Sequence, residues 1–387
     1  MGEMLKNTDW WLLCSAVACS VYGLVILWSM GMMFYGSGTA LVKMQTVAVL
    51  LGVGCALVIS FIDYHVIAAC WKIIAPLALL LVGLTFVVGL QAVGTDDRAW
   101  LEIGGVSLQP SEILKIAFIL TFSVHLERVQ EHMNKPLSLL LLCVHGAFPV
   151  LLIHFQGDDG TALIFAFIFV CMLVAAGLSW KYILAALLAS PLLLAFVWFF
   201  VMDDMHRRRI WIVFQPELDP LGDGYQAMQG KITLGSGQML GRGLFNESLR
   251  SVPAMKNDFI FAYIGQVLGF LGCLAVVLLL TVLAIRCLLV ARKSTDFLGY
   301  LICVGVFAIF AFQAIVNMGM SLSVTPVIGI TLPLFSSGGT SVTITYLSIG
   351  LVLSVWRNRR SDMFETTGRI KIERVHSLPG VTENSNH

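Results

Sequence analysis

Long apolar runs, separated by short polar connections, dominate the chain. A helix that crosses the roughly 30 Å hydrocarbon core of a bilayer needs about 17–25 mostly apolar residues, and such runs follow one another along most of the sequence. We therefore predict an all-α polytopic membrane protein of about ten transmembrane helices. The predicted spans are Trp10–Met30, Met44–Ile62, Ile73–Leu90, Ser111–Leu126, Ser138–Ile153, Ala162–Leu178, Tyr182–Met202, Phe259–Ile285, Phe297–Val316 and Thr340–Trp356.

The lysines and arginines of the short connections alternate onto one side of the membrane. Because positively charged connections stay in the cytoplasm, Lys72, Lys135, Lys181 and the basic run at 357–360 predict that both termini are cytoplasmic. Residues 1–360 then form one transmembrane domain, with a large extracytoplasmic loop at about 203–258. Residues 361–387 are polar and predict a flexible cytoplasmic tail.

Composition supports a membrane protein and excludes other classes. Hydrophobic residues make up 58% of the 387 residues and charged residues 12%, with a mean hydropathy of +0.88, whereas soluble domains are roughly 25% charged. The net charge of +1, with dispersed basic residues, gives no indication of nucleic-acid binding. The nine cysteines and eight histidines lack the spacing of a metal site, so we expect no protein-built zinc site.

The predicted outer loop is too long to be a simple connection in a compact bundle, which favours a functional role. Its glycines suggest tight turns, and residues 227–234 can form a short interfacial helix. The loop also contains three consecutive arginines, of which Arg209 is the last, and a Gly224-Tyr225-Gln226 segment. For the arginines, a solvated basic loop is the simpler alternative.

Ionisable groups within or beside spanning helices are costly, so each is a candidate functional residue. In the run Gln109–Lys115, Pro110 suits a first helical turn, while Glu112 and Lys115 share a face and can pair. This pair either compensates itself at a helix start or forms a charged wall of an outer cavity.

Two more carboxylate groups lie at predicted helix starts. A helix cap explains one of the adjacent residues Asp158 and Asp159, but not both. Asp258 either caps the eighth span or acts as a base, and these alternatives differ because asparagine also caps helices but is no base.

The last polar cluster begins with Asn317 and continues through a Gly/Ser/Pro-rich stretch that ends in Ser336-Ser337-Gly338-Gly339. Such backbone at membrane depth is tolerated where it packs in protein or lines a wet cavity, which makes a re-entrant loop plausible. All these clusters fall on the outer side of the predicted topology. They indicate one polar, outward-facing site for a substrate with phosphate and hydroxyl groups.

Several segments, in order along the chain, resemble the RodA/FtsW/SpoVE family of peptidoglycan polymerases. They are Arg98–Gly104, Gln109–Glu112 with Lys115, Gln156–Thr161, Arg209–Trp211, Gly224–Gln226, Gly241–Gly243, Val252–Pro253, Asp258–Ala262 and Pro326–Gly339. The resemblance implies a glycosyltransferase of the bacterial cell membrane that polymerises lipid II during elongation, division or sporulation. It also implies a class B penicillin-binding transpeptidase as partner.

The resemblance assigns roles to individual residues. Asp258 matches the essential aspartate of the family and would be the general base, while Lys115, Arg209 and Arg98 would bind the diphosphate. No cofactor is implied firmly, although the diphosphate allows a divalent cation, Mg²⁺ or Mn²⁺. The other residues implied in substrate binding are Trp100, Glu112, Gln156, Asp158, Gln226, Ser336, Gly338 and Gly339.

Three motifs depart from the family pattern. Its Gln-Pro-Asp reads Gln156-Gly157-Asp158 here, its Pro-Glu reads Pro253-Ala254, and its Glu-Glu-Leu-Gly reads Gln266-Val267-Leu268-Gly269. Two alternatives to the polymerase therefore stay open. A polar cavity in a helical bundle also suits a lipid II flippase or transporter, and the lost acidic residues suit a non-catalytic scaffold for division or elongation.

Overall fold

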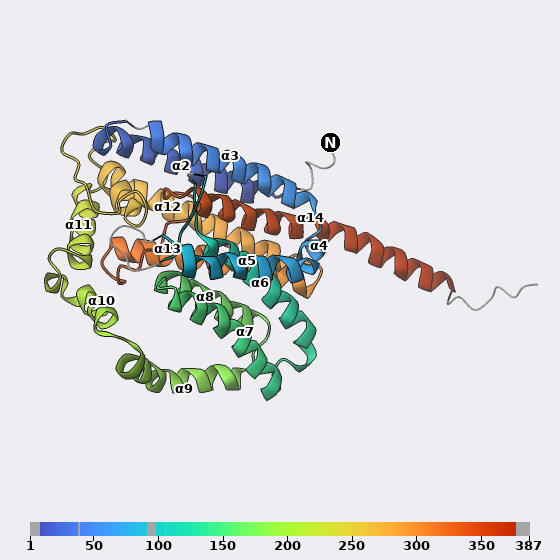
Figure 1. The fold of residues 1–387 in the computed structure, drawn as a ribbon. Coiled ribbons are helices and arrows are strands. Elements are labelled where there is room, and N and C mark those ends of the chain that lie inside the picture. The colour runs from blue at the N-terminus through green and yellow to red at the C-terminus, as the bar shows by residue number, and fades with distance from the viewer. Residues whose placement is uncertain (1–7, 38, 91–97, 105, 377–387) are drawn as a thin grey trace, which may run out of the picture.

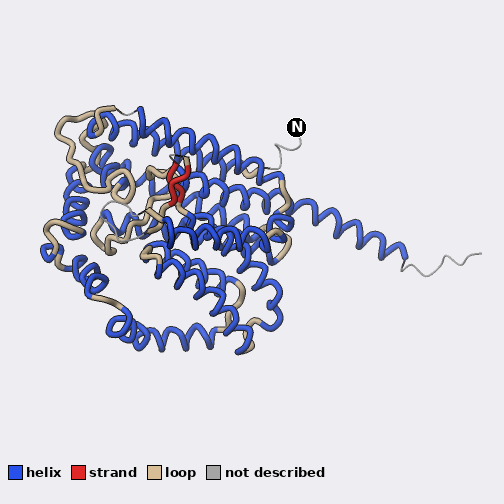
Figure 2. The backbone as a smooth tube through the Cα atoms, in the orientation of Figure 1, coloured by secondary structure: helices blue, strands red, loops and turns tan. Residues whose placement is uncertain are grey.

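The computed structural model describes residues 8–37, 39–90, 98–104 and 106–376, and it is almost entirely helical in that part of the chain (Figures 1 and 2). Its longer helices are α2 (Trp10–Phe34), α3 (Thr39–Phe61), α5 (Trp71–Val88), α6 (Pro110–Val129), α7 (Pro136–Phe155), α8 (Asp159–Ala175), α9 (Trp180–Phe196), α10 (Asp204–Phe214), α11 (Asp223–Ser236), α12 (Ile260–Arg292), α13 (Phe297–Ser321) and α14 (Gly339–His376). Shorter pieces are α4 (Tyr64–Ala69), η1 (Gln130–His132), η2 (Val197–Val201), η3 (Pro216–Leu218), β1 (Leu101–Ile103) and β2 (Val106–Leu108).

Each of the ten predicted spans coincides with one long helix. Eight helices are long and apolar enough to cross a membrane: α2, α3, α5, α7, α9 with η2, α12, α13 and the first part of α14. Of the other two, α8 is apolar but only 17 residues long, and α6 carries charged residues at both ends, among them Glu112 and Arg128. The chain is a multi-pass membrane protein.

The two ends of the bundle differ. The N-terminal end of α2 and the C-terminal part of α14 lie at one end, and α10 and α11 lie at the other (Figure 1). An ion pair between Asp9, the N-cap of α2, and Arg286 places the C-terminal part of α12 at the same end as the start of α2. We call the end with α10 and α11 the outer end, after the predicted topology.

The most buried spanning helices are α13, the first part of α14 and α2, and α14 packs along α3. Small residues let α3 and α14 approach: a Cβ added at Gly52 would lie 2.8 Å from Cδ2 of Tyr346. The Tyr346 hydroxyl lies 2.8 Å from the Ser20 hydroxyl of α2, so this buried polar group is paired. Close backbone packing with shared hydroxyl bonds is the usual way helices associate in lipid.

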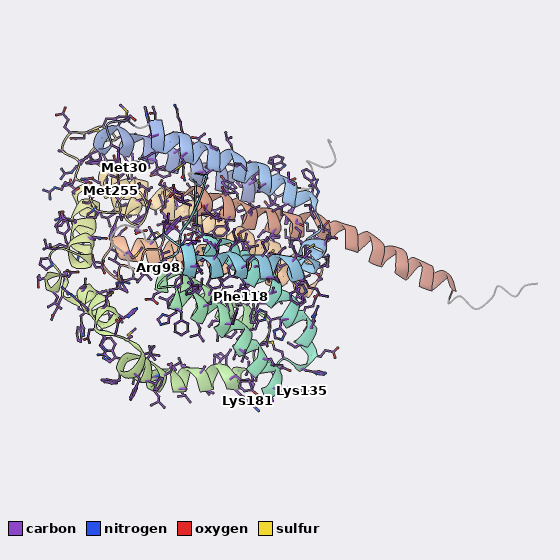
Figure 3. All side chains as sticks on the ribbon, in the orientation of Figure 1. Met30, Arg98, Phe118, Lys135, Lys181 and Met255 are labelled. Carbon is purple, nitrogen blue, oxygen red and sulfur yellow. The ribbon has the colours of Figure 1, made fainter. Side chains whose placement is uncertain are left out.

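Helix α9 stands at the periphery, away from the centre of the bundle (Figure 1). None of its residues is buried, although α9 and η2 together form one of the most apolar segments of the chain. At its start, Tyr182 donates from its hydroxyl to the carbonyl of Asn134, near the corner where Figure 3 labels Lys135 and Lys181. Lipid, rather than protein, is therefore the environment of its side chains.

The predicted outer loop at 203–258 is folded rather than irregular. It contains α10, η3 and α11, and α11 includes the residues 227–234 predicted as a short helix. After α11, the backbone runs beside a kink in α12, where Gly269 has a φ of +67°. Two pairs of backbone hydrogen bonds join the loop to the kinked part of α12. The shorter bonds of the two pairs are Arg242 N to Gln266 O (2.9 Å) and Phe270 N to Gln238 O (2.8 Å).

Gly269 is required at this kink. A positive φ is costly for residues with a Cβ, and a Cβ here would lie 2.4 Å from the backbone nitrogen of Gly241. Opening α12 frees backbone groups that would otherwise bond within the helix, and the loop satisfies them.

The sequence analysis did not predict the small hairpin of β1 and β2. Its antiparallel register pairs Leu101 with Leu108, and Thr340 at the start of α14 donates from its hydroxyl to the Ser107 carbonyl at 2.8 Å. At the opposite end of the chain, α14 continues beyond the predicted Trp356 to His376. The first part of the predicted tail is thus helical, and residues 377–387 lie outside the described residues.

Candidate active site

Asp258 lies in a tight turn at the outer end of α12. The N-cap of α12 is Phe259, which makes no side-chain capping bond, and the helix begins at Ile260. Asp258 is therefore not the N-cap, so the simple capping explanation of this carboxylate was wrong. The turn is closed by the carbonyl of Ala254, which accepts bonds from the backbone nitrogens of Asn257 and Asp258, both at 2.9 Å.

Ala254 has a φ of +54°. An alanine pays about 1–2 kcal/mol for this left-handed conformation. Strained backbone of this kind is commonly found where surrounding contacts fix a functional residue. Here the surrounding contacts come from the stretch between α13 and α14.

Three consecutive carbonyls of the Asp258 turn accept hydrogen bonds, two of them from that stretch and one from Asn317 of α13. Ser337 N donates to Lys256 O (2.8 Å), Ser336 Oγ donates to Asn257 O (2.5 Å), and Asn317 Nδ2 donates to Asp258 O (2.9 Å). The same two side chains also bind the 326–337 backbone, because Asn317 Nδ2 donates to Ile330 O and Ser336 Oγ accepts from Leu332 N. The stretch is therefore a packed, non-helical segment attached to the turn.

A polar residue of α3 fixes the same segment from the other side. Gln45 is 3% exposed, its Nε2 donates to Ser336 O (3.0 Å), and its Oε1 accepts from Gly338 N (3.1 Å). Gly339 begins α14 directly afterwards. Ser336, Gly338 and Gly339 thus lie beside the backbone of the Asp258 turn, as the sequence predicted for one outer cluster.

The second cluster joins the starts of α6 and α8. Asp158 caps α8 by accepting from Thr161 N (2.9 Å), and its other oxygen accepts from Gln109 Nε2 (3.1 Å). The Gln156 amide donates to the Thr85 hydroxyl and to the Arg98 carbonyl. The Arg98 side chain is exposed, and the half-buried Trp100 bonds through its carbonyl to Leu90 N.

Glu112 and Lys115 form the predicted pair, with Lys115 Nζ 2.8 Å from Glu112 Oε1. Their side chains are only 7% and 1% exposed, respectively. The pair is buried inside the bundle, and the structure does not place it on an open wall of a cavity. A buried pair of this kind is costly to break because the remaining charge has no partner.

Arg209 lies on α10 and faces α11. Its Nε is 3.3 Å from Asp223 Oδ2, and Gln226 follows on the first turn of α11. Burial raises the pKa of the Asp223 carboxyl, although the charge of Arg209 opposes this effect. The described contacts do not join Arg209 directly to the Asp258 turn, so the predicted single site consists of neighbouring groups at the outer end.

The second aspartate of the 156–161 cluster belongs to a histidine–aspartate chain, which we call the clasp. Asp159 Oδ1 lies 2.6 Å from His154 Nδ1 at the end of α7, and its Oδ2 lies 2.6 Å from His206 Nε2 on α10. His206 Nδ1 in turn lies 2.5 Å from Asp203 Oδ1. Capping by Asp158 and the clasp at Asp159 together account for both carboxylates, contrary to the expectation that structure explains only one.

No metal centre is evident in the part of the chain that the structure describes, because no three His, Cys, Asp or Glu side chains there are placed to hold an ion. The predicted Mg²⁺ or Mn²⁺ therefore stays a prediction, and a diphosphate would have to supply most of its ligands.

A family model matches nearly all of the described chain. The model of the FtsW, RodA and SpoVE family, described as a cell cycle protein, matches residues 9–361. The chain belongs to this family.

Individual relatives cover almost the whole chain. The peptidoglycan glycosyltransferase MrdB of Escherichia coli is 30% identical over 89% of this chain and 92% of its own length. The probable peptidoglycan glycosyltransferase FtsW of Geobacter metallireducens is 31% identical over 91% of this chain and 95% of its own length.

Solved structures have the same fold. A chain of a structure described as the structural coordination of polymerization and crosslinking by a peptidoglycan synthase complex has a TM-score of 0.79 and 29% identity. It is matched over 98% of its length by 91% of this chain. The rod shape determining protein RodA of Thermus thermophilus has a TM-score of 0.68 and 27% identity, over 91% of this chain and 97% of its own.

One departure from the family pattern now has a structural explanation. Gln266 is fully buried, and its amide pairs with the backbone of Arg250, donating to the carbonyl at 3.2 Å and accepting from the nitrogen at 2.8 Å once the amide is oriented to suit. A glutamate could accept from the nitrogen but could not donate to the carbonyl. The glutamine is thus matched to this chain's own loop.

Some residues that support the candidate site were not predicted from the sequence. Gln45, Thr85, His154 and His206 were not selected, and Asn317 was noted only as part of a cluster. The signal for Gln45 was a lone amide within an apolar span, which is costly unless bonded. Nothing in the local sequence connects His206 with Asp159, because the α8 and α9 helices separate them.

Proposed function

We propose that this chain is a peptidoglycan glycosyltransferase that polymerises lipid II, with Asp258 as general base. The observation that carries the proposal is the placement of Asp258 in a strained turn outside the helix cap, with three carbonyls of the turn bonded to the 317–337 region. A carboxylate that only stabilised the helix would occupy the N-cap, where Phe259 stands instead.

In the proposed reaction, Asp258 removes the proton from a hydroxyl of the acceptor sugar. That oxygen attacks the anomeric carbon of the donor, and the bond to undecaprenyl diphosphate breaks with inversion. In an inverting reaction of this type, the base and the leaving group lie on opposite faces of the sugar. Removal of one general base typically reduces the rate about 10²–10⁴-fold.

Negative charge develops on the departing diphosphate, and arginines bind phosphate well because they donate in a bidentate fork. The exposed Arg98 and the partly exposed Arg209 are suited to this role, with Trp100, Gln156, Asp158 and Gln226 nearby in the same outer segments. Lys115 is 1% exposed and already paired with Glu112. We therefore assign this pair to the support of the site.

We further propose a class B penicillin-binding transpeptidase as the partner. The structural relative described as a synthase complex that coordinates polymerization with crosslinking supports this assignment. A glycan strand made at the outer end must be cross-linked on the same side of the membrane.

The test is polymerisation of purified lipid II by the full chain together with its transpeptidase partner. Asp258→Asn keeps the shape of the side chain and should reduce glycan synthesis at least about 10²-fold, with the same elution profile and Tm. Asp204→Asn, which removes a fully exposed carboxylate of α10, is the matched control and should keep wild-type activity. Full activity of Asp258→Asn would refute the base.

Lipid vesicles that contain the chain and lipid II separate the alternative functions. Transfer of lipid II across the bilayer without any polymer would favour a flippase, and the absence of both activities in the presence of a bound partner would favour a scaffold.

A further inference from the structure

We infer that Asn317 and Ser336 are positioning residues, which hold the backbone of the Asp258 turn where its carboxylate can reach the acceptor hydroxyl. The inference rests on the proposed role of Asp258 and assigns the part of the molecule that places it.

The turn cannot hold its own position through helical bonds. It precedes the first residue of α12, and its nitrogens are used internally on the Ala254 carbonyl. Its three outward carbonyls, from Lys256, Asn257 and Asp258, join it to neighbouring parts of the protein. All three accept from one region, through Ser337 N, Ser336 Oγ and Asn317 Nδ2.

Asn317 is built to be a rigid link. It is 0% exposed, lies on α13, and uses its amide nitrogen on two carbonyls at once, Asp258 O at 2.9 Å and Ile330 O at 2.7 Å. Since α13 is the most buried of the spanning helices, its side chains are fixed by packing. The Asn317 hydrogen bond therefore fixes the backbone of Asp258 relative to α13, the most buried spanning helix.

Ser336 repeats this arrangement from the other side. Its hydroxyl donates to Asn257 O and accepts from Leu332 N at 2.8 Å, and its own carbonyl accepts from Gln45 on α3. The two side chains thus bracket the turn, one from α13 and one from a segment anchored to α3.

Such links affect the chemistry as well as the stability of the fold. Displacement of a reacting group by about 1 Å can reduce a rate on the order of 10²-fold while substrate binding is kept. We expect Asn317→Ala to lower kcat for lipid II polymerisation by about 10²-fold, measured per folded protein, with little change in KM. Ser336→Ala removes a smaller group and should lower kcat by about tenfold.

Asn317→Asp is the sharper variant. It keeps the volume of the side chain but replaces the donor nitrogen with an oxygen that faces two carbonyl oxygens, so kcat should fall at least as far as in Asn317→Ala. The matched control is Asn134→Ala, because Asn134 also donates to a loop carbonyl, that of Gly177, but at the opposite end of the bundle. Its kcat should equal the wild-type value.

The outcomes are distinct. The inference is overturned if kcat per folded protein is unchanged in Asn317→Ala and Ser336→Ala. It is also overturned if their total activity falls only in proportion to the amount of folded protein that is recovered. If those variants are impaired but Asp258→Asn is fully active, the proposed base fails and this inference fails with it. If Asp258→Asn is inactive while both positioning variants are normal, only the inference fails.

Discussion

Helices α13 and α9 are both apolar spans, yet they have opposite environments. Most of α13 is buried, and it holds polar residues such as Gln313, Asn317 and Ser321 inside the protein. Helix α9 has no buried residue and presents Leu188, Leu192 and Phe199 of the adjoining η2 to lipid. Hydropathy alone therefore does not distinguish a helix that organises the site from one that only crosses the membrane.

The difference shows where this chain places its polar groups. Helices α6 and α13 carry buried polar groups whose partners lie inside the protein, such as Lys115 with Glu112 and Asn317 with two carbonyls. The segment from α9 to α10 meets the bundle through partly exposed groups at its end, the clasp of His154, Asp159 and His206. The first arrangement gives rigidity, and the second depends on protonation.

The largest expected effect comes from breaking a buried pair. Lys115→Met leaves Glu112 without its partner inside the bundle, which should cost about 3–5 kcal/mol and abolish glycan synthesis. Thermal unfolding in detergent measures the loss. Asp204 and Arg207 form a pair of the same i,i+3 spacing in which Asp204 is fully exposed, so Asp204→Asn should leave the Tm unchanged. Equal Tm losses would remove the distinction between the two regions.

Removal of one phenyl ring from each region should give the next largest difference. Phe310 on α13 is 1% exposed and Phe199 in η2 is 68% exposed. Phe310→Ala leaves a cavity and should cost about 3 kcal/mol, the lower end of the usual range. Phe199→Ala removes contacts with lipid and should change the unfolding free energy by less than about 0.5 kcal/mol. A comparable loss in Phe199→Ala would mean that α9 packs on protein.

The smallest effect, and the only one that depends on pH, concerns the clasp. Burial tends to lower the pKa of His206, but its hydrogen bonds to Asp159 and Asp203 and their charges outweigh this and raise the pKa above its usual range. A raised folded-state pKa gives stability that is complete below the unfolded value of about 6.5 and is lost as pH rises through the folded value. The groups that face His206 are Asp159 of α8, Asp203 of its own segment and His154 of α7.

We therefore expect α10 to loosen by about 1 kcal/mol as pH rises from about 6 to 9. Hydrogen exchange of α10 amides, corrected for the intrinsic effect of pH, measures this. His206→Gln should abolish the pH dependence, whereas His132→Gln, at the exposed η1 turn, should retain it. A pH dependence that persists in His206→Gln would show that another group controls α10.

The membrane-spanning helices, whose apolar length is set by the thickness of the bilayer, were predictable from the sequence. All ten apolar runs are helices, and the Glu112–Lys115 pair follows from its spacing. The missed features depend on partners far along the chain: the kink at Gly269 is stabilised by residues 238–243, and the β1–β2 hairpin is held by Thr340. Local pattern carries no information about such contacts.

The candidate site divides in the same way. Motifs selected Asp258, Asp158 and Ser336, which the structure places at the end of the bundle with α10 and α11. They could not tell that Asp258 precedes the N-cap of α12. Nor could they tell that Lys115 is enclosed, because enclosure depends on how α6 packs against its neighbours rather than on the residues of α6.

The close packing of α3 with α14 has a consequence for the order in which the protein is assembled. Thr343 of α14 donates to the Ala48 carbonyl of α3 across 295 residues of sequence, and Gly52 of α3 meets Tyr346 of α14. Contacts of such long range form late, and a chain synthesised from its N-terminus places α14 in the membrane after α3 and after the spans between them. Until then the inner face of α3 lacks its partner, and Gln45 lacks the Ser336 and Gly338 backbone that it binds. A chain truncated before α14 would therefore expose the face of α3 that packs against α14, and membrane quality control could recognise this exposed surface.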